Sequence, residues 1–200
     1  MEIIRIKITK ILEIMLTPRE IYSEFQNKII DKRSASEVLI NLVENSQDEN
    51  LREESINYIK KIGLKNQSIF EFLENLFISD LNEHIRNAAF NAIKNNFKEK
   101  TIKPALFAIF KEKGFLVLIQ VIEFLIDNFK PFSCRAVLIQ KIKNLDYKFS
   151  TYELNLMNLE NLNLIQLKNI IYDYLLSNSL ENLYFHRRKI PFAVDLDYID

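Results

Sequence analysis

The sequence predicts an all-α protein, and three observations lead to that prediction. The 200 residues include only 2 glycines and 4 prolines, whereas folds built on strands and tight turns need glycine for positive backbone φ. Helix-capping signals follow one another along the chain. One pair of predicted helices recurs after 34 positions, which is typical of a helical repeat array. A chain of 200 residues suits one domain or one short array.

Residues 1–33 are expected to form capping helices at the N-terminus. Thr17-Pro18-Arg19-Glu20 has the form of a capping box with proline at the first helical position, so a helix is expected to begin there. Residues 1–16 carry basic side chains, which leaves a membrane-surface helix as an alternative. No stretch is apolar over the 18 or more residues that a membrane span needs. The apolar residues of this segment fall on one face of a helix: Ile4, Ile8, Ile11, Leu12 and Met15.

Residues 34–97 contain two copies of one helix–turn–helix unit. Leu51-Arg52 recurs as Ile85-Arg86, 34 positions later. At the same spacing, the expected N-cap Asp48 becomes Asn82, and the small residue Ser55 becomes Ala89. In the first copy, serine caps are expected to start the helix at Ser34, and Gly63 follows the second helix as its C-terminal glycine.

A third, weaker copy follows at a spacing of about 32. Residues 105–113 form its expected first helix, and the nearly continuous apolar run 115–129 forms its second. The cap position is occupied by Gly114 and the arginine position by Leu118. The repeat region is therefore expected to span residues 34–128, with terminal copies modified as caps.

The C-terminal part, residues 129–184, is expected to be helical but divergent. Pro131 interrupts the chain before a helix around Ala136–Ile142, and Ser150-Thr151-Tyr152-Glu153 is a second capping box. The piece 159–167 fits half of a leucine-rich repeat, but an isolated match has no neighbours to pack on. Residues 185–200 are expected to form an irregular tail, a single strand or the start of a truncated segment. A helical stripe favours helix over that repeat: Leu164, Leu167, Ile171, Tyr174 and Leu175.

The two repeat copies resemble HEAT repeats, of the short kind found in phycobilin-lyase-type and armadillo-like proteins. The chain has no tryptophan and lacks the signature of tetratricopeptide repeats. The resemblance implies a right-handed α-solenoid of antiparallel helix pairs, an armadillo-type superhelix, in which second helices line the concave face. It also implies that the cap and arginine positions form a structural ladder between repeats. Those positions are Asp48, Arg52, Asn82 and Arg86.

Under this resemblance, a partner is expected to contact exposed polar positions of the second helices. The alternative is an ordinary solvated face, which is what most polar helix faces are. The candidate partner-binding residues are Asn57, Lys60, Lys61, Asn87, Asn91, Lys94 and Asn95.

Sequence signatures of catalysis are missing. The chain has no GxGxxG, Walker, HExxH or CxxC motif, and its two histidines and one cysteine are too few for most metal sites. Cys134 lies in an apolar helix pattern and is expected to be a buried, inert thiol. A single cysteine also fits a reducing compartment, so we expect a cytoplasmic protein without catalytic residues, metal or cofactor.

Three function classes follow from the resemblance. The first is a non-catalytic scaffold whose concave face binds a protein or peptide. The second is a nucleic-acid-binding protein similar to HEAT-like DNA glycosylases, in which Lys60, Lys61, Arg86 and Lys94 contact phosphates. A formal net charge of +0 disfavours it, because phosphate binding gains from many cations. The third is a lyase-associated protein, supported by fold analogy alone. We favour the scaffold.

Overall fold

The computed structural model describes residues 17–145 and 158–187, with side chains described as far as residue 176. Within these ranges every regular element is a helix, as the sequence predicts. The chain divides into two compact units, Met1–Phe129 and Lys130–Asp200, called the N-terminal and C-terminal units below. Three predictions lie outside the described residues: the helix over 1–16, the capping box at 150–153 and the strand expected near the C-terminus.

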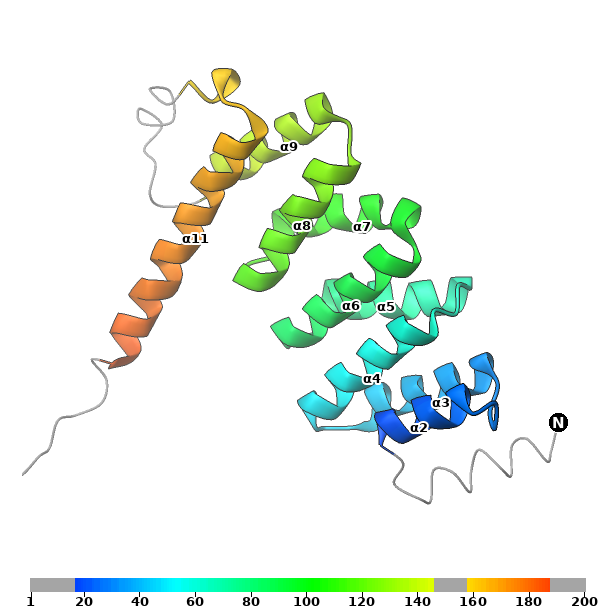
Figure 1. Cartoon of the computed structure of the whole chain (residues 1–200). Coiled ribbons are helices and arrows are strands. Elements are labelled where there is room, and N and C mark those ends of the chain that lie inside the picture. Colours follow the sequence, from blue (N-terminus) through cyan, green and yellow to red (C-terminus); the bar gives the residue numbers. More distant parts are fainter. Residues whose placement is uncertain (1–16, 146–157, 188–200) are drawn as a thin grey trace, which may run out of the picture. The chain divides into compact units, whose positions relative to one another are not determined.

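The N-terminal unit consists of consecutive helix pairs (Figure 1). Helix α3 packs on α4, α5 on α6, and α7 on α8, while α2 covers both α3 and α4. Helix α6 also packs between α4 and α8, so the second helices of the pairs form one layer. The bounds are α2 Pro18–Gln26, α3 Lys32–Asn45, α4 Glu49–Ile62, α5 Gln67–Ser79, α6 Glu83–Asn96, α7 Lys98–Lys111 and α8 Phe115–Asn128.

The predicted caps of α2, α4 and α6 are confirmed. The Thr17 hydroxyl accepts a hydrogen bond from the Glu20 N–H at 3.3 Å, and the Glu20 carboxylate accepts one from the Thr17 N–H at 2.7 Å. Asp48 and Asn82 accept hydrogen bonds from the first-turn N–H groups of α4 and α6. Gly63 ends α4 with φ +65°, a left-handed conformation that favours glycine.

Three predicted helix starts are wrong. Helix α3 begins at Lys32 because Asp31, not a serine, is its N-cap and accepts from the Ser34 N–H at 2.7 Å. Helix α7 begins at Lys98 and continues through Pro104, although proline normally ends a helix pattern. Helix α9 begins at Pro131, since proline is well tolerated in the first turn.

The repeat register predicted from the sequence is seen in the burial pattern. Ser55 and Ala89, at equivalent positions, are both 0% exposed. So are Ile56, Phe90 and Ile122, which occupy one position of three successive second helices. Phe90 lies centrally, with its ring centroid 4.8 Å from that of Phe77 and 5.8 Å from that of Phe124. One aromatic contact chain therefore connects the second pair to the third.

Two arginines link successive helix pairs, as expected of structural ladder residues. Arg52 on α4 donates to the Val43 carbonyl at 3.0 Å and forms an ion pair with Asp80, which follows α5. Arg86 on α6 binds both carboxylate oxygens of Glu112, which follows α7, at 2.8 and 2.9 Å. Each arginine thus ties its own pair to the linker of the next one.

The third pair has a different cap because Gly114 stands at its N-cap position. A carboxylate from the preceding pair replaces the missing side chain, since Glu83 on α6 accepts from the Leu116 N–H at 2.7 Å. A Cβ atom at Gly114 would lie 2.5 Å from that Glu83 oxygen, so the glycine makes room for it. Leu118, at the arginine position, is 0% exposed, and its apolar side chain replaces the ladder contact with core packing.

The C-terminal unit contains α9 Pro131–Lys143, a short 3₁₀ helix η1 Leu159–Asn161 and α11 Leu164–Arg187. Helix α9 packs on α11. Leu167 and Ile171 are 0% exposed and Leu175 is 9% exposed, so three residues of the predicted stripe form the buried side of α11. The other two, Leu164 and Tyr174, are half-buried. The prediction of helix rather than leucine-rich repeat is therefore confirmed over the described part.

Candidate functional site

The seven predicted partner-binding residues lie on two neighbouring helices of the second-helix layer. Only Lys61 and Asn95 are exposed as predicted. The other five are half-buried, because α4, α6 and α8 pack closely enough to cover part of each side chain. Three of them pair by the repeat spacing with positions on the next helix: Asn57 with Asn91, Lys60 with Lys94, and Lys61 with Asn95. The predicted residues therefore belong to a surface that recurs from one repeat to the next.

The asparagines of α6 form a short row of amides. Asn91 donates to the Asn87 side-chain oxygen at 3.5 Å, and Asn95 donates to the Asn91 carbonyl at 2.8 Å. The side chain of Asn57, on α4, makes no hydrogen bond to another described residue. An amide offers one acceptor and two donors, so each of these side chains keeps capacity for a further polar contact.

Lys94 connects α6 with α8. Its ammonium donates to the Gln120 side-chain oxygen at 2.9 Å and lies 5.6 Å from the Phe90 ring centroid. Burial lowers the pKa of Lys94; the nearby Glu123 carboxylate opposes this effect and the Lys60 ammonium adds to it. Gln120 and Glu123 were missed as site residues, although they are the polar interruptions of the apolar run 115–126.

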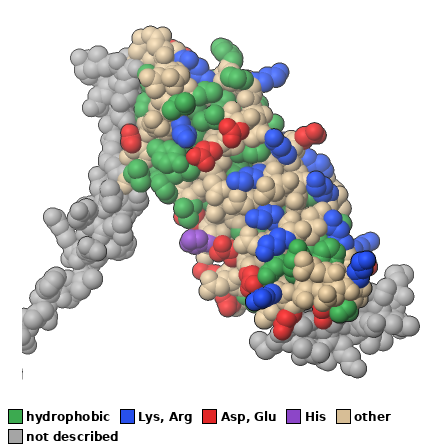
Figure 2. Space-filling view, in the orientation of Figure 1, with side chains coloured by type: hydrophobic (Ala, Val, Ile, Leu, Met, Phe, Trp, Pro, Cys, Tyr) green, Lys and Arg blue, Asp and Glu red, His purple; other side chains and the backbone are tan. Residues whose placement is uncertain are grey.

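A depression of about 330 Å³ lies beside these residues, where the C-terminal parts of α6 and α8 meet. Lys94 and Lys98 line it from one side, and Glu123 and Asp127 line it from the other. Figure 2 shows lysine and arginine side chains gathering over the surface that α4 and α6 form in this view. The layer therefore offers amides and cations from α4 and α6, followed by carboxylates from α8. We call it the α4–α6–α8 face.

Lys61 lies at the α2 end of this face. Its ammonium is 4.5 Å from the ring centroid of Tyr58 and 5.9 Å from that of Tyr22, and the two rings are 5.0 Å apart. Such cation–π contacts are worth about 0.5–1 kcal/mol at exposed sites. They hold the lysine against the aromatic pair, so its charge has a defined place on the face.

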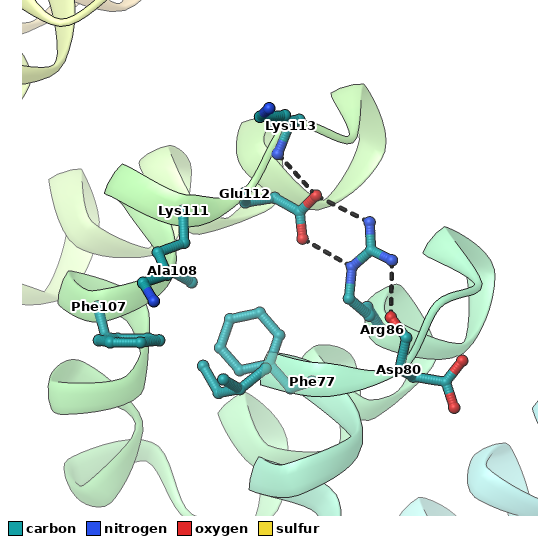
Figure 3. Close-up of a pocket in the computed structure, with 9 residues that line it drawn as sticks. Phe77, Asp80, Arg86, Phe107, Ala108, Lys111, Glu112 and Lys113 are labelled. Atoms are coloured by element: carbon teal, nitrogen blue, oxygen red, sulfur yellow. Dashed lines mark hydrogen bonds and ion pairs between the residues drawn. The ribbon is translucent and has the colours of Figure 1, made fainter.

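A second depression, of about 270 Å³, lies at the ladder between α5 and α7 (Figure 3). Arg86 and Glu112 line it but bind each other, and Arg86 also donates to the Asp80 and Leu81 carbonyls at 2.9 and 3.0 Å. Phe77 and Phe107 border the same depression from α5 and α7. Arg86, Glu112 and the Asp80 carbonyl thus serve the link between pairs.

The described residues include a cysteine thiol and several carboxylates that could in principle serve as a nucleophile or as metal ligands. Cys134 is buried, as predicted, and burial raises the pKa of its thiol to about 11. No group of three or more histidine, cysteine, aspartate or glutamate side chains is placed to hold a metal ion in the described part of the chain. Within the same described part, every helix is too short or too polar to cross a membrane.

Cys134 is accordingly expected to resist alkylation in the folded protein. A thiol with a pKa of about 11 instead of 9.0 has roughly a hundredfold less thiolate at pH 8, and burial slows its reaction further. Iodoacetamide labelling followed by intact-mass measurement checks this, with complete labelling in 6–8 M urea as the control. Rapid labelling of the native protein would contradict the burial of Cys134.

Comparison of the chain with models of protein families, with curated protein sequences and with solved structures found no match.

Proposed function

We propose that the protein is a non-catalytic scaffold that binds a segment of a partner protein along the α4–α6–α8 face. In this proposal the helix pairs are antiparallel and stack as a right-handed, HEAT-like α-solenoid whose second helices line the concave face. The proposed location is the cytoplasm, where a single cysteine stays reduced.

The observation that carries the proposal is the recurrence of half-buried polar side chains at equivalent positions of α4 and α6. Packed helices lie about 8–10 Å apart. An extended chain in the polyproline II conformation rises about 3.1 Å per residue with three residues per turn, so its backbone groups recur on one side at about this distance. Amides such as Asn57 and Asn91 on successive helices are therefore matched to backbone groups three residues apart in an extended partner segment.

The charges on the face indicate which segment fits. Lys60 and Lys94 lie close enough for the first to lower the pKa of the second, and Lys61 extends this cationic region. Glu123 and Asp127 lie beyond them on α8. A segment with an acidic residue over α4 and α6 and a basic residue over α8 would complement this order. Electrostatic complementarity of this kind sets register and specificity more than affinity.

A crosslinking experiment tests the proposal. The photoreactive residue p-benzoylphenylalanine is placed at Asn57 or Asn95 on the face, and at Lys65 in the exposed α4–α5 linker as the control. Irradiation in cells, followed by mass spectrometry, identifies what each position touches. A protein adduct formed from both face positions and absent from the linker position is the expected result.

The expected effect of mutation is then measured with the crosslinked partner segment. Asn91→Ala combined with Lys94→Met removes an amide and a charge while keeping the lysine stem, and should weaken binding at least tenfold, or about 1.4 kcal/mol. Lys65→Met should change affinity less than twofold. Equal affinity for all three proteins would reject the α4–α6–α8 face as the binding site. Nucleic-acid adducts released steeply by salt would instead favour the nucleic-acid-binding alternative.

A further inference from the structure

A second surface lies on the first-helix side of the N-terminal unit, between α5 and α7. A depression of about 390 Å³ there adjoins the one of about 270 Å³ at the ladder, and Ile78 and Phe107 line both. Neither depression is lined by any of the seven candidate partner-binding residues of the α4–α6–α8 face. We call the two together the α5–α7 groove.

Polar contacts join α5 and α7 at both ends of this groove. At one end, the Lys100 ammonium of α7 donates to the Gln67 side-chain oxygen of α5 at 2.7 Å. At the other end, Arg86 joins Glu112 to the Asp80 carbonyl. The stretch of α5 that lines the groove, residues 71–79, is about 12 Å long at 1.5 Å per residue. The groove therefore has room for two to three turns of a helix.

The floor and rim of the groove are apolar in the middle. Pro104 and Ala108 are buried beneath it, whereas Phe107 is 46% exposed. In Figure 3 the Phe77 and Phe107 rings border the cavity from the two helices. Phe110, 43% exposed, adds a second exposed ring one turn along α7. Exposed aromatic side chains beside a cavity mark protein-interaction sites, because their burial supplies much of the binding energy.

The two walls of the groove carry opposite charges. Glu71 and Glu74 line it from α5, and Lys103 and Lys111 line it from α7. None of these four side chains belongs to the ion pairs Arg33–Glu37, Arg52–Asp80 and Arg86–Glu112. Glu71 accepts a hydrogen bond from the Gln67 side chain of its own helix at 2.8 Å and keeps its charge. The Lys111 ammonium lies 5.0 Å from the Phe107 ring centroid instead. Both walls therefore keep charges to offer a ligand between them.

We propose that the α5–α7 groove binds an amphipathic helix of a partner protein. Its apolar residues, at i, i+3 or i+4 spacing, contact Phe107 and Ile78. One edge of this helix is basic and faces Glu71 and Glu74, and the other is acidic and faces Lys103 and Lys111. A helix fits because the groove lies between two helices, where a third can pack at the usual 8–10 Å.

Three helix-stapled, fluorescein-labelled peptides of about 14 residues test this directly. All three share one leucine-rich face. The mixed peptide has one basic and one acidic edge, the second peptide has two basic edges, and the third has two acidic edges. Fluorescence anisotropy with the whole protein should rank the mixed peptide tightest, at least about tenfold above the others. A peptide with its two edges exchanged would be a poor control, because a helix that lies in the opposite direction presents the same edges to the same walls. The control peptides therefore differ from the mixed peptide in the total charge of their edges.

Protein variants locate the binding. Phe107→Ser should weaken the mixed peptide about thirtyfold, the loss typical of an aromatic anchor. Phe132→Ser, which changes a side chain 85% exposed on α9, is the control and should have no effect. Glu71→Lys with Glu74→Lys makes both walls basic and should move the preference to the peptide with two acidic edges. Thermal unfolding confirms that each variant is folded.

Two outcomes would overturn the inference. One is unsaturable binding, or binding unchanged by Phe107→Ser. The other is self-association of the protein that Phe107→Ser abolishes in sedimentation, which would make a second copy the occupant. The Asn91→Ala/Lys94→Met variant should bind the mixed peptide like wild type. This variant therefore distinguishes a wrong proposal about the groove from a wrong proposal about the α4–α6–α8 face.

Discussion

Ala89→Asp is expected to lower the free energy of unfolding by about 3–5 kcal/mol, the usual cost of an unpaired charge in a core. Ala89 is 0% exposed on α6 and next to Phe90, which contacts both Phe77 and Phe124. The new carboxylate would replace apolar contacts where α4, α5 and α8 pack around α6. Urea unfolding followed by circular dichroism measures the change.

Asn75→Asp is the matched control, because Asn75 is exposed in the middle of α5. It introduces the same charge on a helix but outside the core, so its effect should stay within about 0.5 kcal/mol. If both variants unfold at the wild-type urea concentration, the repeat register that places Ala89 between helices is wrong.

Arg86→Met is expected to cost about 3 kcal/mol, because it leaves the Glu112 carboxylate buried without its guanidinium. The Glu112 side chain is 6% exposed in this ion pair and the Arg86 side chain 16%. Methionine keeps most of the apolar stem, so the loss reports on the charge pair together with the Arg86 hydrogen bonds to the Asp80 and Leu81 carbonyls. Urea unfolding of the wild type and the variant at pH 7 measures this difference in the free energy of unfolding.

The cost of Arg86→Met should also depend on pH. Burial raises the pKa of Glu112, but the Arg86 hydrogen bonds and the Gly114 and Lys113 N–H groups outweigh it and hold the pKa below 4.5. A carboxyl whose pKa is depressed on folding stabilises the protein above its unfolded pKa, and this stabilisation is lost as the pH falls through the folded pKa. The difference between wild type and Arg86→Met should therefore shrink between pH 7 and pH 3.

A second substitution separates the charge from the hydrogen bonds. Glu112 also accepts from the Lys113 and Gly114 N–H groups at 2.9 and 2.6 Å. Arg86→Met with Glu112→Gln removes the Glu112 charge but keeps an oxygen for those donors, and should recover about half of the lost stability. An Arg86→Met cost that is the same at both pH values would argue against a charge effect.

Much of the helical organisation could be predicted from the sequence, because the signals are local. The capping box at Thr17, the caps at Asp48 and Asn82 and the left-handed Gly63 each act within one helical turn. The repeat spacing then placed Ser55 and Ala89 in the core. Local rules also misled, since Pro104 lies inside α7, where proline is usually excluded.

The candidate binding residues show the limit of this reasoning. Helical periodicity separates a core side from an outer side, but it does not say how far a neighbouring helix covers the outer side. Five of the seven predicted residues are therefore half-buried, and Gln120 joins Lys94 from a helix whose polar positions were passed over. The α5–α7 groove was not foreseen, because it depends on where two packed helices leave space between their side chains.

By itself, the sequence determined the all-helical class, the caps of three helices and the repeat register, because caps and periodic apolar positions act between residues a few places apart. Only the tertiary structure decided which distant groups meet. Glu83 caps α8 from 33 positions away, and Arg86 meets Glu112 from 26 positions away. Contacts at such separations depend on the angle and spacing at which whole helices pack, and many residue types satisfy the same packing.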